Sequence, residues 1–415
     1  MKKSFQTSVQ SSAQASAKSK SPALSNAKRN LRLVISESAI TAGLLAMSVL
    51  TPFYNSIGLN NEEIAFTQMI FTVAAIIFNI PLGYVADRFS RKWANAIGDI
   101  GTGLSLLVYA SMSSVIGVVI CELVVGVMSA LSDGVDQSLL KHFASKIAKS
   151  TGASETRILK SKTAKLECYK YLCNLFLLIL GGPIGAIDLR LAIALSSINH
   201  FIGGAIGLFI KDDSEKLHPQ HQNPLKDMFV IAKTALKTKP LRWRIFAYAV
   251  GREATHGVIW IVTPLFLRAG IPLELVSFAW AFNALTAVLG TRLAARFSHK
   301  LTDSQIMIVP ILLMTISMGI MGIHLNIITV WLYGLMGVVQ GWSGATLIPM
   351  VQKHTKPSEQ TSVLSLTKVL AQLLYIPAVW LIGVAADIHL EYGLFATIII
   401  FLPLGLIIIK KLKSV

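Results

Sequence analysis

The sequence predicts an all-α membrane protein whose twelve transmembrane helices form two pseudo-symmetric bundles of six. Three observations predict this fold: the composition, the spacing of the apolar segments and a repeat within the chain. The 415 residues are 53% hydrophobic and only 14% charged, whereas a soluble domain carries roughly 25% charged residues. We therefore expect much of the surface to face lipid.

Twelve apolar segments approach the length of about 20 residues that a helix needs to span a bilayer. They lie near residues 32–53, 65–85, 93–112, 114–137, 163–186, 189–210, 243–267, 274–295, 304–324, 326–348, 361–385 and 391–411. The connecting loops are short except 138–162 and 211–242. We expect a disordered cytoplasmic tail at 1–31, bundles at 32–210 and 243–415, and a central cytoplasmic loop at 211–242.

Two stretches of the first half recur, in altered form, in the second half. Gly58–Phe66 and Gly270–Phe278 carry Gly, Glu and Phe at the same places. The hairpin Asp87–Lys92 returns as Ala295–Lys300, in which the first acid has become Ala. Two related halves predict a substrate site near the middle of the membrane, between the bundles.

Lys and Arg accumulate in alternate loops of this arrangement. If the N-terminus is inside the cell, the outside loops hold only Arg190 and Arg268 from the basic set. The rule that cytoplasmic loops are Lys- and Arg-rich then places both termini in the cytoplasm. We expect a multi-pass protein of the cytoplasmic (inner) membrane. Since topology accounts for the net charge of +17, we expect no nucleic-acid partner.

The loop between the second and third spans carries the most specific motif. Its residues Gly83-Tyr-Val-Ala-Asp-Arg-Phe-Ser-Arg-Lys92 resemble the major facilitator superfamily hairpin, Gly-x-x-x-Asp-Arg-x-Gly-Arg-Lys/Arg. The matching positions are Gly83, Asp87, Arg88, Arg91 and Lys92. Ser90 replaces the second Gly. The resemblance covers the chain from about residue 31 to its end and implies the major facilitator fold.

The same resemblance implies a gating role for the hairpin. In the outward-facing state, Asp87 would bind the N-terminus of a helix in the other half, which is a favourable place for an anion. Arg88 or Arg91 would pair with Asp133 or Asp136 at the cytoplasmic end of the fourth span. The alternative is that the hairpin only fixes the topology.

A glycine-rich motif in the fifth span resembles that of the antiporter branch of the same family. Its residues are Gly181, Gly182, Pro183 and Gly185. Glycine permits close helix approach, and proline bends a transmembrane helix. In its motifs the chain is most similar to the proton-coupled exporters of drugs and metabolites. The alternative is a Gly-Pro helix end without directional meaning.

Ionisable residues within spans are the candidates for proton coupling or substrate binding, since burying a charge in a membrane is costly. The candidates are Glu37, Asp99, Glu122, Arg252, Glu253, His256 and Lys368, with the polar–aromatic pair Gln340 and Trp342. Glu37, Glu122 and Glu253 are the leading proton carriers. We hypothesise that Glu253, beside Arg252, couples proton entry to substrate exit. For each residue, a structural ion pair or hydrogen bond is the alternative.

These observations favour a secondary active exporter of an amphipathic small molecule such as a drug, metabolite or siderophore. No phosphate loop or catalytic motif occurs in the sequence, so we expect no enzyme, no cofactor and no metal, and a proton gradient as energy source. The partners expected are the substrate and membrane lipid, and the protein is expected to be a monomer. The alternatives are an uptake symporter for a nutrient and a transporter-fold sensor or lipid translocase.

Overall fold

The computed structural model describes residues 22–88, 90–211, 230, 233–355 and 360–414. The helices of the first half are α2 (Pro22–Thr41), η1 (Leu45–Ser48), α3 (Leu50–Ser56), α4 (Asn61–Arg88), α5 (Arg91–Ser111), α6 (Val115–Ser132), α7 (Val135–Thr151), α8 (Glu155–Ile187) and α9 (Leu189–Leu208). Those of the second half are α11 (Lys239–His256), α12 (Val262–Arg268), α13 (Leu273–Phe297), η2 (Ser298–Lys300), α14 (Asp303–Ile323), η3 (Thr329–Tyr333), α15 (Gly334–Gln352), α16 (Gln360–Ile388) and α17 (Leu390–Lys413).

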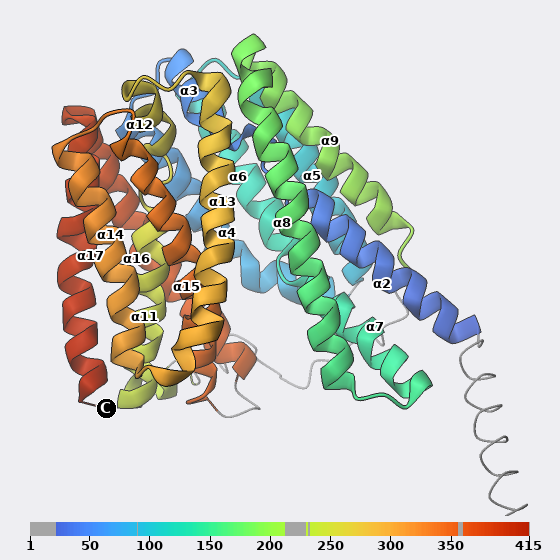
Figure 1. Ribbon diagram of the computed structural model, residues 1–415. Helices are drawn as coiled ribbons and strands as arrows, with labels where there is room; N and C mark the ends of the chain where they lie inside the picture. Colours follow the sequence, from blue (N-terminus) through green and yellow to red (C-terminus); the bar gives the residue numbers. More distant parts are fainter. Residues whose placement is uncertain (1–21, 89, 212–229, 231–232, 356–359, 415) are drawn as a thin grey trace, which may run out of the picture.

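The helices gather into two groups that follow the order of the chain. Figure 1 shows α2 and α5–α9 of the first half on one side and the second-half helices, in yellow to red, on the other, with α3 and α4 overlapping the second half in this view. Nine helical segments of the described chain are long and apolar enough to cross a membrane. Charged α5, the broken α11–α12 segment and α15 complete the twelve-helix arrangement. The expected all-α membrane fold is confirmed.

Two short helices, α3 and α12, show the repeat at atomic detail. Each begins with a Thr-Pro pair near its start and ends at a glycine with positive φ, Gly58 (91°) and Gly270 (89°). In both, the glycine and the residue after it donate backbone hydrogen bonds into the last helical turn, in the same register. This pattern is a Schellman motif, for which a residue without Cβ is preferred. The two halves therefore share their local geometry as well as their sequence.

The first and seventh spans are interrupted helices, although both were expected to be continuous. The first is broken between α2 and η1, where Asn174 of α8 accepts from Leu44 N (3.0 Å) and Asn199 of α9 donates to Gly43 O (3.0 Å). The seventh is broken between α11 and α12, where Thr51 of α3 donates to Trp260 O (2.9 Å). Within a membrane, freed backbone groups must find such partners.

Two glycines bring helices of opposite halves into close contact at equivalent places. A Cβ on Gly182 of α8 would lie 2.7 Å from Leu273 O and 2.6 Å from Ser277 Oγ of α13. A Cβ on Gly383 of α16 would lie 2.7 Å from Asn61 O and 2.7 Å from Ala65 Cβ of α4.

The contacted residues correspond through the repeat that relates Gly58 to Gly270. Leu273 is the counterpart of Asn61, and Ser277 is the counterpart of Ala65. Each half therefore supplies one glycine against which a helix of the other half packs. Within the Gly181–Gly185 motif, Gly182 makes a close contact between the halves, whereas Gly181 and Gly185 pack against Leu45 and Val49 of the first half.

The expected extent of the disordered tail was wrong. Residues 22–31, expected in the disordered tail, belong to α2, because Leu24, Ala27 and Leu31 are buried against α7. The expected loop 138–162 is helical over most of its length, since α7 and α8 fill it. The fourth span ends at Ser132 rather than near 137, where Gly134 (φ 75°) turns the chain into α7. Residues 1–21 and most of 211–242 lie outside the described residues.

Candidate functional site

A cavity of about 820 Å³ lies between the two halves. Its described walls come from α2, α4–α9, the turn before α7, α11 and α16. Its charged and amide lining residues are Glu37, Asn79, Asn95, Asp99, Asp133, Asp136, Gln137, Lys170, Arg252, Lys368 and Gln372. Gly83 of the hairpin motif also lines it, as do residues on either side of the turn at Gly134. The cavity thus reaches the end of the molecule where the described chain starts and where the C-terminus lies (Figure 1).

The first-half wall holds two buried carboxylates side by side. Glu37 of α2 is 2% exposed, Asp99 of α5 is 6% exposed, and the two interact with each other. Ser38 Oγ donates to Glu37 Oε2 (3.2 Å). Among the described atoms, Asp99 Oδ2 and Asn95 Nδ2 are buried without a hydrogen-bond partner, as is His200 Nδ1. Because unsatisfied buried polar groups are uncommon and costly, these atoms mark a place where a proton or ligand can bind.

Asp133 and Asp136, the two acids at the end of the fourth span, each contact a polar side chain of another helix. Asp136 Oδ2 pairs with Lys170 Nζ of α8 (2.8 Å), and Asp133 Oδ2 accepts from Asn79 Nδ2 of α4 (2.9 Å). The side chains of Asp87 and Arg88 lie outside the described residues, so the expected latch stays a prediction.

The start of α5 explains the departure of the hairpin from the family motif. Ser90 is the N-cap of α5, and its hydroxyl accepts a hydrogen bond from Trp93 N (3.5 Å). A serine side chain at this position satisfies a backbone donor that glycine would leave to water. Arg91 and Lys92 follow in the first helical turn.

The second-half wall contributes cations. Arg252 of α11 has a side chain 36% exposed, its Nη1 donates to Tyr248 OH (3.0 Å), and its Nε lies 3.4 Å from Glu253 Oε1. Lys368 of α16 is exposed in the same wall, and Gln372 follows it one turn later on the same helix face. Sequence reasoning found both cations from their places within spans.

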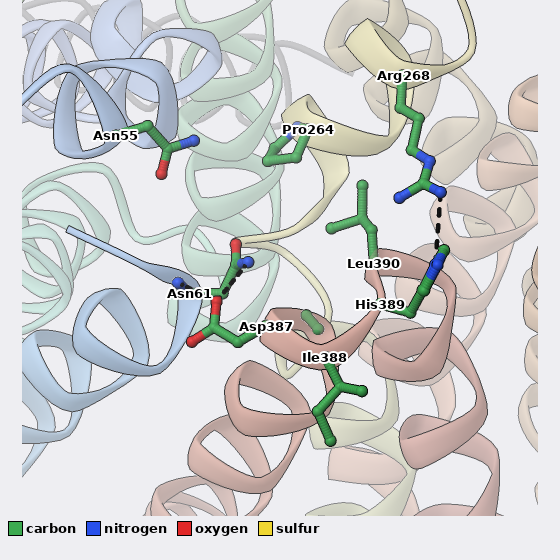
Figure 2. A pocket seen from close by; sticks show the side chains of 9 residues that line it. Asn55, Asn61, Pro264, Arg268, Asp387, Ile388, His389 and Leu390 are labelled. Carbon is green, nitrogen blue, oxygen red and sulfur yellow. Dashed lines mark hydrogen bonds between the residues drawn. The ribbon is translucent and has the colours of Figure 1, made fainter. Parts of the chain in front are cut away.

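The opposite end of the cavity is closed by hydrogen bonds between the halves. Asp387 at the end of α16 accepts from Asn61 N (2.7 Å), Asn61 Nδ2 (2.8 Å) and Glu62 N (2.8 Å) at the start of α4. Trp380 Nε1 also donates to Glu62 Oε1 (3.2 Å). Figure 2 shows Asp387 pointing at Asn61, beside a smaller hollow of about 390 Å³. Sequence reasoning missed Asp387, whose signal was an acid directly after an apolar span.

Glu122 belongs to a separate buried network. Its Oε1 accepts from Tyr54 OH (3.0 Å), Gln68 Nε2 (2.8 Å) and Tyr109 OH (2.9 Å), which come from α3, α4 and α5. Glu122 is not among the residues that line the large cavity. The network therefore ties four first-half helices together away from the space that a substrate would occupy.

The remaining candidates lie behind the second-half wall. Glu253 is 3% exposed and held by Arg252. His256 Nδ1 lies 3.0 Å from the carbonyl oxygen of Arg252, one turn earlier in α11. Trp342 is buried and its Nε1 donates to Ile306 O (3.0 Å), which is a packing arrangement. Neither Gln340 nor Trp342 lines the cavity.

The chain thus has two related halves with a cavity between them, and part of its first half matches a known family. The family model described as Major Facilitator Superfamily matches residues 34–154. No curated protein sequence matches the chain significantly.

Several solved structures share the fold while being distant in sequence. A mutant form of the nucleoside transporter NupG has a TM-score of 0.73 at 14% identity, over 92% of this chain and 99% of its own. A D-xylose–proton symporter has 0.69 at 14%, over 91% and 96%. A bacterial homologue of the human lysosomal transporter Spinster, inward-facing and unoccupied, has 0.68 at 12%, over 95% and 98%. At these identities the likenesses show that the chain shares the fold of these proteins.

Proposed function

We propose that the protein is a secondary transporter that moves a small molecule by alternating access through the cavity between its halves. The main support for the proposal is the cavity, which is lined by both halves. At one end, Asp387 of α16 joins the halves through its hydrogen bonds to the start of α4. If the basic loops face the cytoplasm, the cavity opens to the cytoplasm and the cap by Asp387 closes the outer side.

Proton coupling is proposed at Glu37 and Asp99. Two carboxylates in contact away from water favour sharing one proton, because two adjacent negative charges repel each other. The other groups that face this pair are Asp136 on α7, Lys170 on α8 and His200 on α9. Glu122 and Glu253 are less suited to carry the proton, because neither lines the cavity. Each is already bound, Glu122 by Tyr54 and Glu253 by Arg252.

Export by proton antiport is the favoured direction, as the Gly181–Gly185 motif suggests. The alternative is uptake by proton symport, and a sensor or lipid translocase with this fold is a further alternative. A vesicle assay with labelled amphipathic acids, bases and zwitterions distinguishes the two directions of transport. An exporter accumulates its cargo in everted vesicles acidified inside, whereas a symporter accumulates it in right-side-out vesicles acidified outside.

A second measurement tests the coupling site without a known cargo. Spin labels placed across the open end of the cavity report the fraction of molecules open at that end. In the wild type we expect this fraction to change between pH 5 and pH 8, and we expect Glu37→Gln and Asp99→Asn to remove most of the change. Glu122→Gln serves as the control that retains it. A pH response that survives both cavity variants contradicts the proposal.

A further inference from the structure

The two walls of the cavity carry opposite charge. Among the described lining residues, all the acids, Glu37, Asp99, Asp133 and Asp136, come from the first half. The second half contributes Arg252 and Lys368. Lys170, the first-half cation, is already paired with Asp136 at 2.8 Å. A molecule in the cavity therefore lies between a negative and a positive wall.

The second-half wall has cationic groups that could bind an anion. Arg252 is oriented by Tyr248 through Nη1 and by Glu253 through Nε, and no bond is recorded for its Nη2 among the described residues. Because Glu253 offsets part of that charge, Lys368 supplies the uncompensated positive charge. No ion pair to Lys368 is recorded within the described residues, and Gln372 adds an amide on the same face.

The first-half wall has an acceptor atom that could bind a donor. Asp99 Oδ2 is buried, lines the cavity and lacks a hydrogen-bond partner within the described part of the chain. Glu37 lies beside it. An ammonium group placed here would satisfy Asp99 Oδ2 and offset the repulsion between the two carboxylates, which a neutral group would not do.

A cargo molecule with one charge would pair with the charged groups of one wall only. The charged groups of the other wall would lose water without gaining a partner, which costs binding free energy. We propose that the cargo is a zwitterion. Its ammonium binds at Asp99 and Glu37, and its carboxylate or phosphate binds at Lys368 and Arg252. The proposal rests on the transporter function above and narrows its substrate class. It also gives antiport a simple physical basis, since the cargo ammonium and the proton would compete for the same pair of carboxylates.

Binding to the purified full-length protein in nanodiscs tests this inference without any gradient. The probes are a homologous series of ω-amino carboxylates, with n-alkylamines and n-alkyl carboxylates of matched length. The series also measures the separation of the two binding groups. We expect one chain length to bind at least tenfold more tightly than the matched amine or carboxylate. A carboxylate and a phosphonate version of that length distinguish the two anionic groups.

Two variants assign the ends of the probe. Lys368→Gln should weaken binding of the zwitterion and of the carboxylate about tenfold, because each loses a charge-assisted contact. Binding of the amine should be unchanged. Asp99→Asn should weaken binding of the zwitterion and of the amine and leave binding of the carboxylate unchanged. Lys368→Arg, which keeps the charge, should retain most of the affinity.

The inference is overturned if a singly charged probe binds as tightly as every zwitterion, if no zwitterion binds, or if Lys368→Gln has no effect. Since these measurements involve no transport, they are separable from a failure of the transporter proposal. Zwitterion binding without proton-driven movement would contradict the coupling scheme alone.

Discussion

Asp387 caps the N-terminus of α4 at Asn61, across the boundary between the two halves. The carboxylate accepts from two successive backbone N–H groups, at 2.7 and 2.8 Å, and from the Asn61 amide at 2.8 Å. A carboxylate at a helix N-terminus is favoured both by the unpaired N–H groups and by the helix dipole. Here the cap is made by the other half, so it requires that the two halves meet at this end of the molecule.

Asp387→Asn should loosen the closed end. The substitution removes the charge and one acceptor, a change of about 1–2 kcal/mol by analogy with other caps. Hydrogen exchange of the first amides of α4 should quicken by about tenfold. Glu391→Gln is a matched control, because Glu391 pairs with Arg268 within its own half (3.2 Å). Equal exchange rates in both variants would show that the cap does not hold this end closed.

Gly182→Ala and Gly383→Ala should each favour opening at the capped end. An added methyl group would meet backbone oxygens at 2.7 Å, and backbone cannot give way as a flexible side chain can. Distance measurements between spin labels on α4 and α16 should show a larger separated fraction.

Gly344→Ala provides the control for these two variants. A Cβ on Gly344 of α15 would meet nothing within 4 Å. Alanine in a helix interior is about 0.5–1 kcal/mol better than glycine, so this variant should be neutral or stabilising. If all three variants behave alike, the tight contacts do not bias the conformation.

Asp99→Asn should stabilise the protein while impairing coupling. A buried charge is costly, and the variant replaces the Asp99 carboxylate by a neutral amide of the same size, so we expect Tm to rise by a few degrees at neutral pH. Asn95→Ala, at the neighbouring unpartnered amide, should leave the carboxylate pair in place and produce no such rise. A fall in Tm on Asp99→Asn would mean that the carboxylate is needed structurally.

Glu122→Ala and Glu122→Gln should differ sharply. Alanine would remove the shared acceptor: Tyr109 and Gln68 each keep a further acceptor, but Tyr54 OH would lose its bond to Glu122. An unsatisfied buried group costs about 1–3 kcal/mol. We expect a large fall in Tm for alanine and a small one for glutamine, which keeps an oxygen acceptor. Proton-driven movement should survive in Glu122→Gln. Its loss there would return Glu122 to the list of proton carriers.

Much of the fold could be predicted from the sequence because apolar length and loop charge are local signals. The breaks in the first and seventh spans could not, since Ala42–Leu44 and Gly257–Ile261 are as apolar as the helices around them. The backbone groups freed at Gly43 and Leu44 are satisfied by Asn174 and Asn199, which are more than 100 residues away in sequence.

The charged residues of the candidate site could be predicted from the sequence, but their partners could not. Glu37, Asp99, Arg252 and Lys368 were identified because charge within a span is conspicuous. Glu122 has the same signal, yet its donors are supplied by three other helices, and only the folded chain shows that they enclose it. A helix cap between the halves was expected from an aspartate of the hairpin. The one observed is made by Asp387, at the other end of the molecule.

The paired glycines give the boundary between the halves the character of an isologous dimer interface. Gly182 meets Leu273 and Ser277, and Gly383 meets their counterparts Asn61 and Ala65. In a two-fold dimer, each patch contacts its own copy in this reciprocal way. The two halves are then two self-complementary modules. Co-expression of the two halves as separate chains should accordingly reassemble the complete twelve-helix protein.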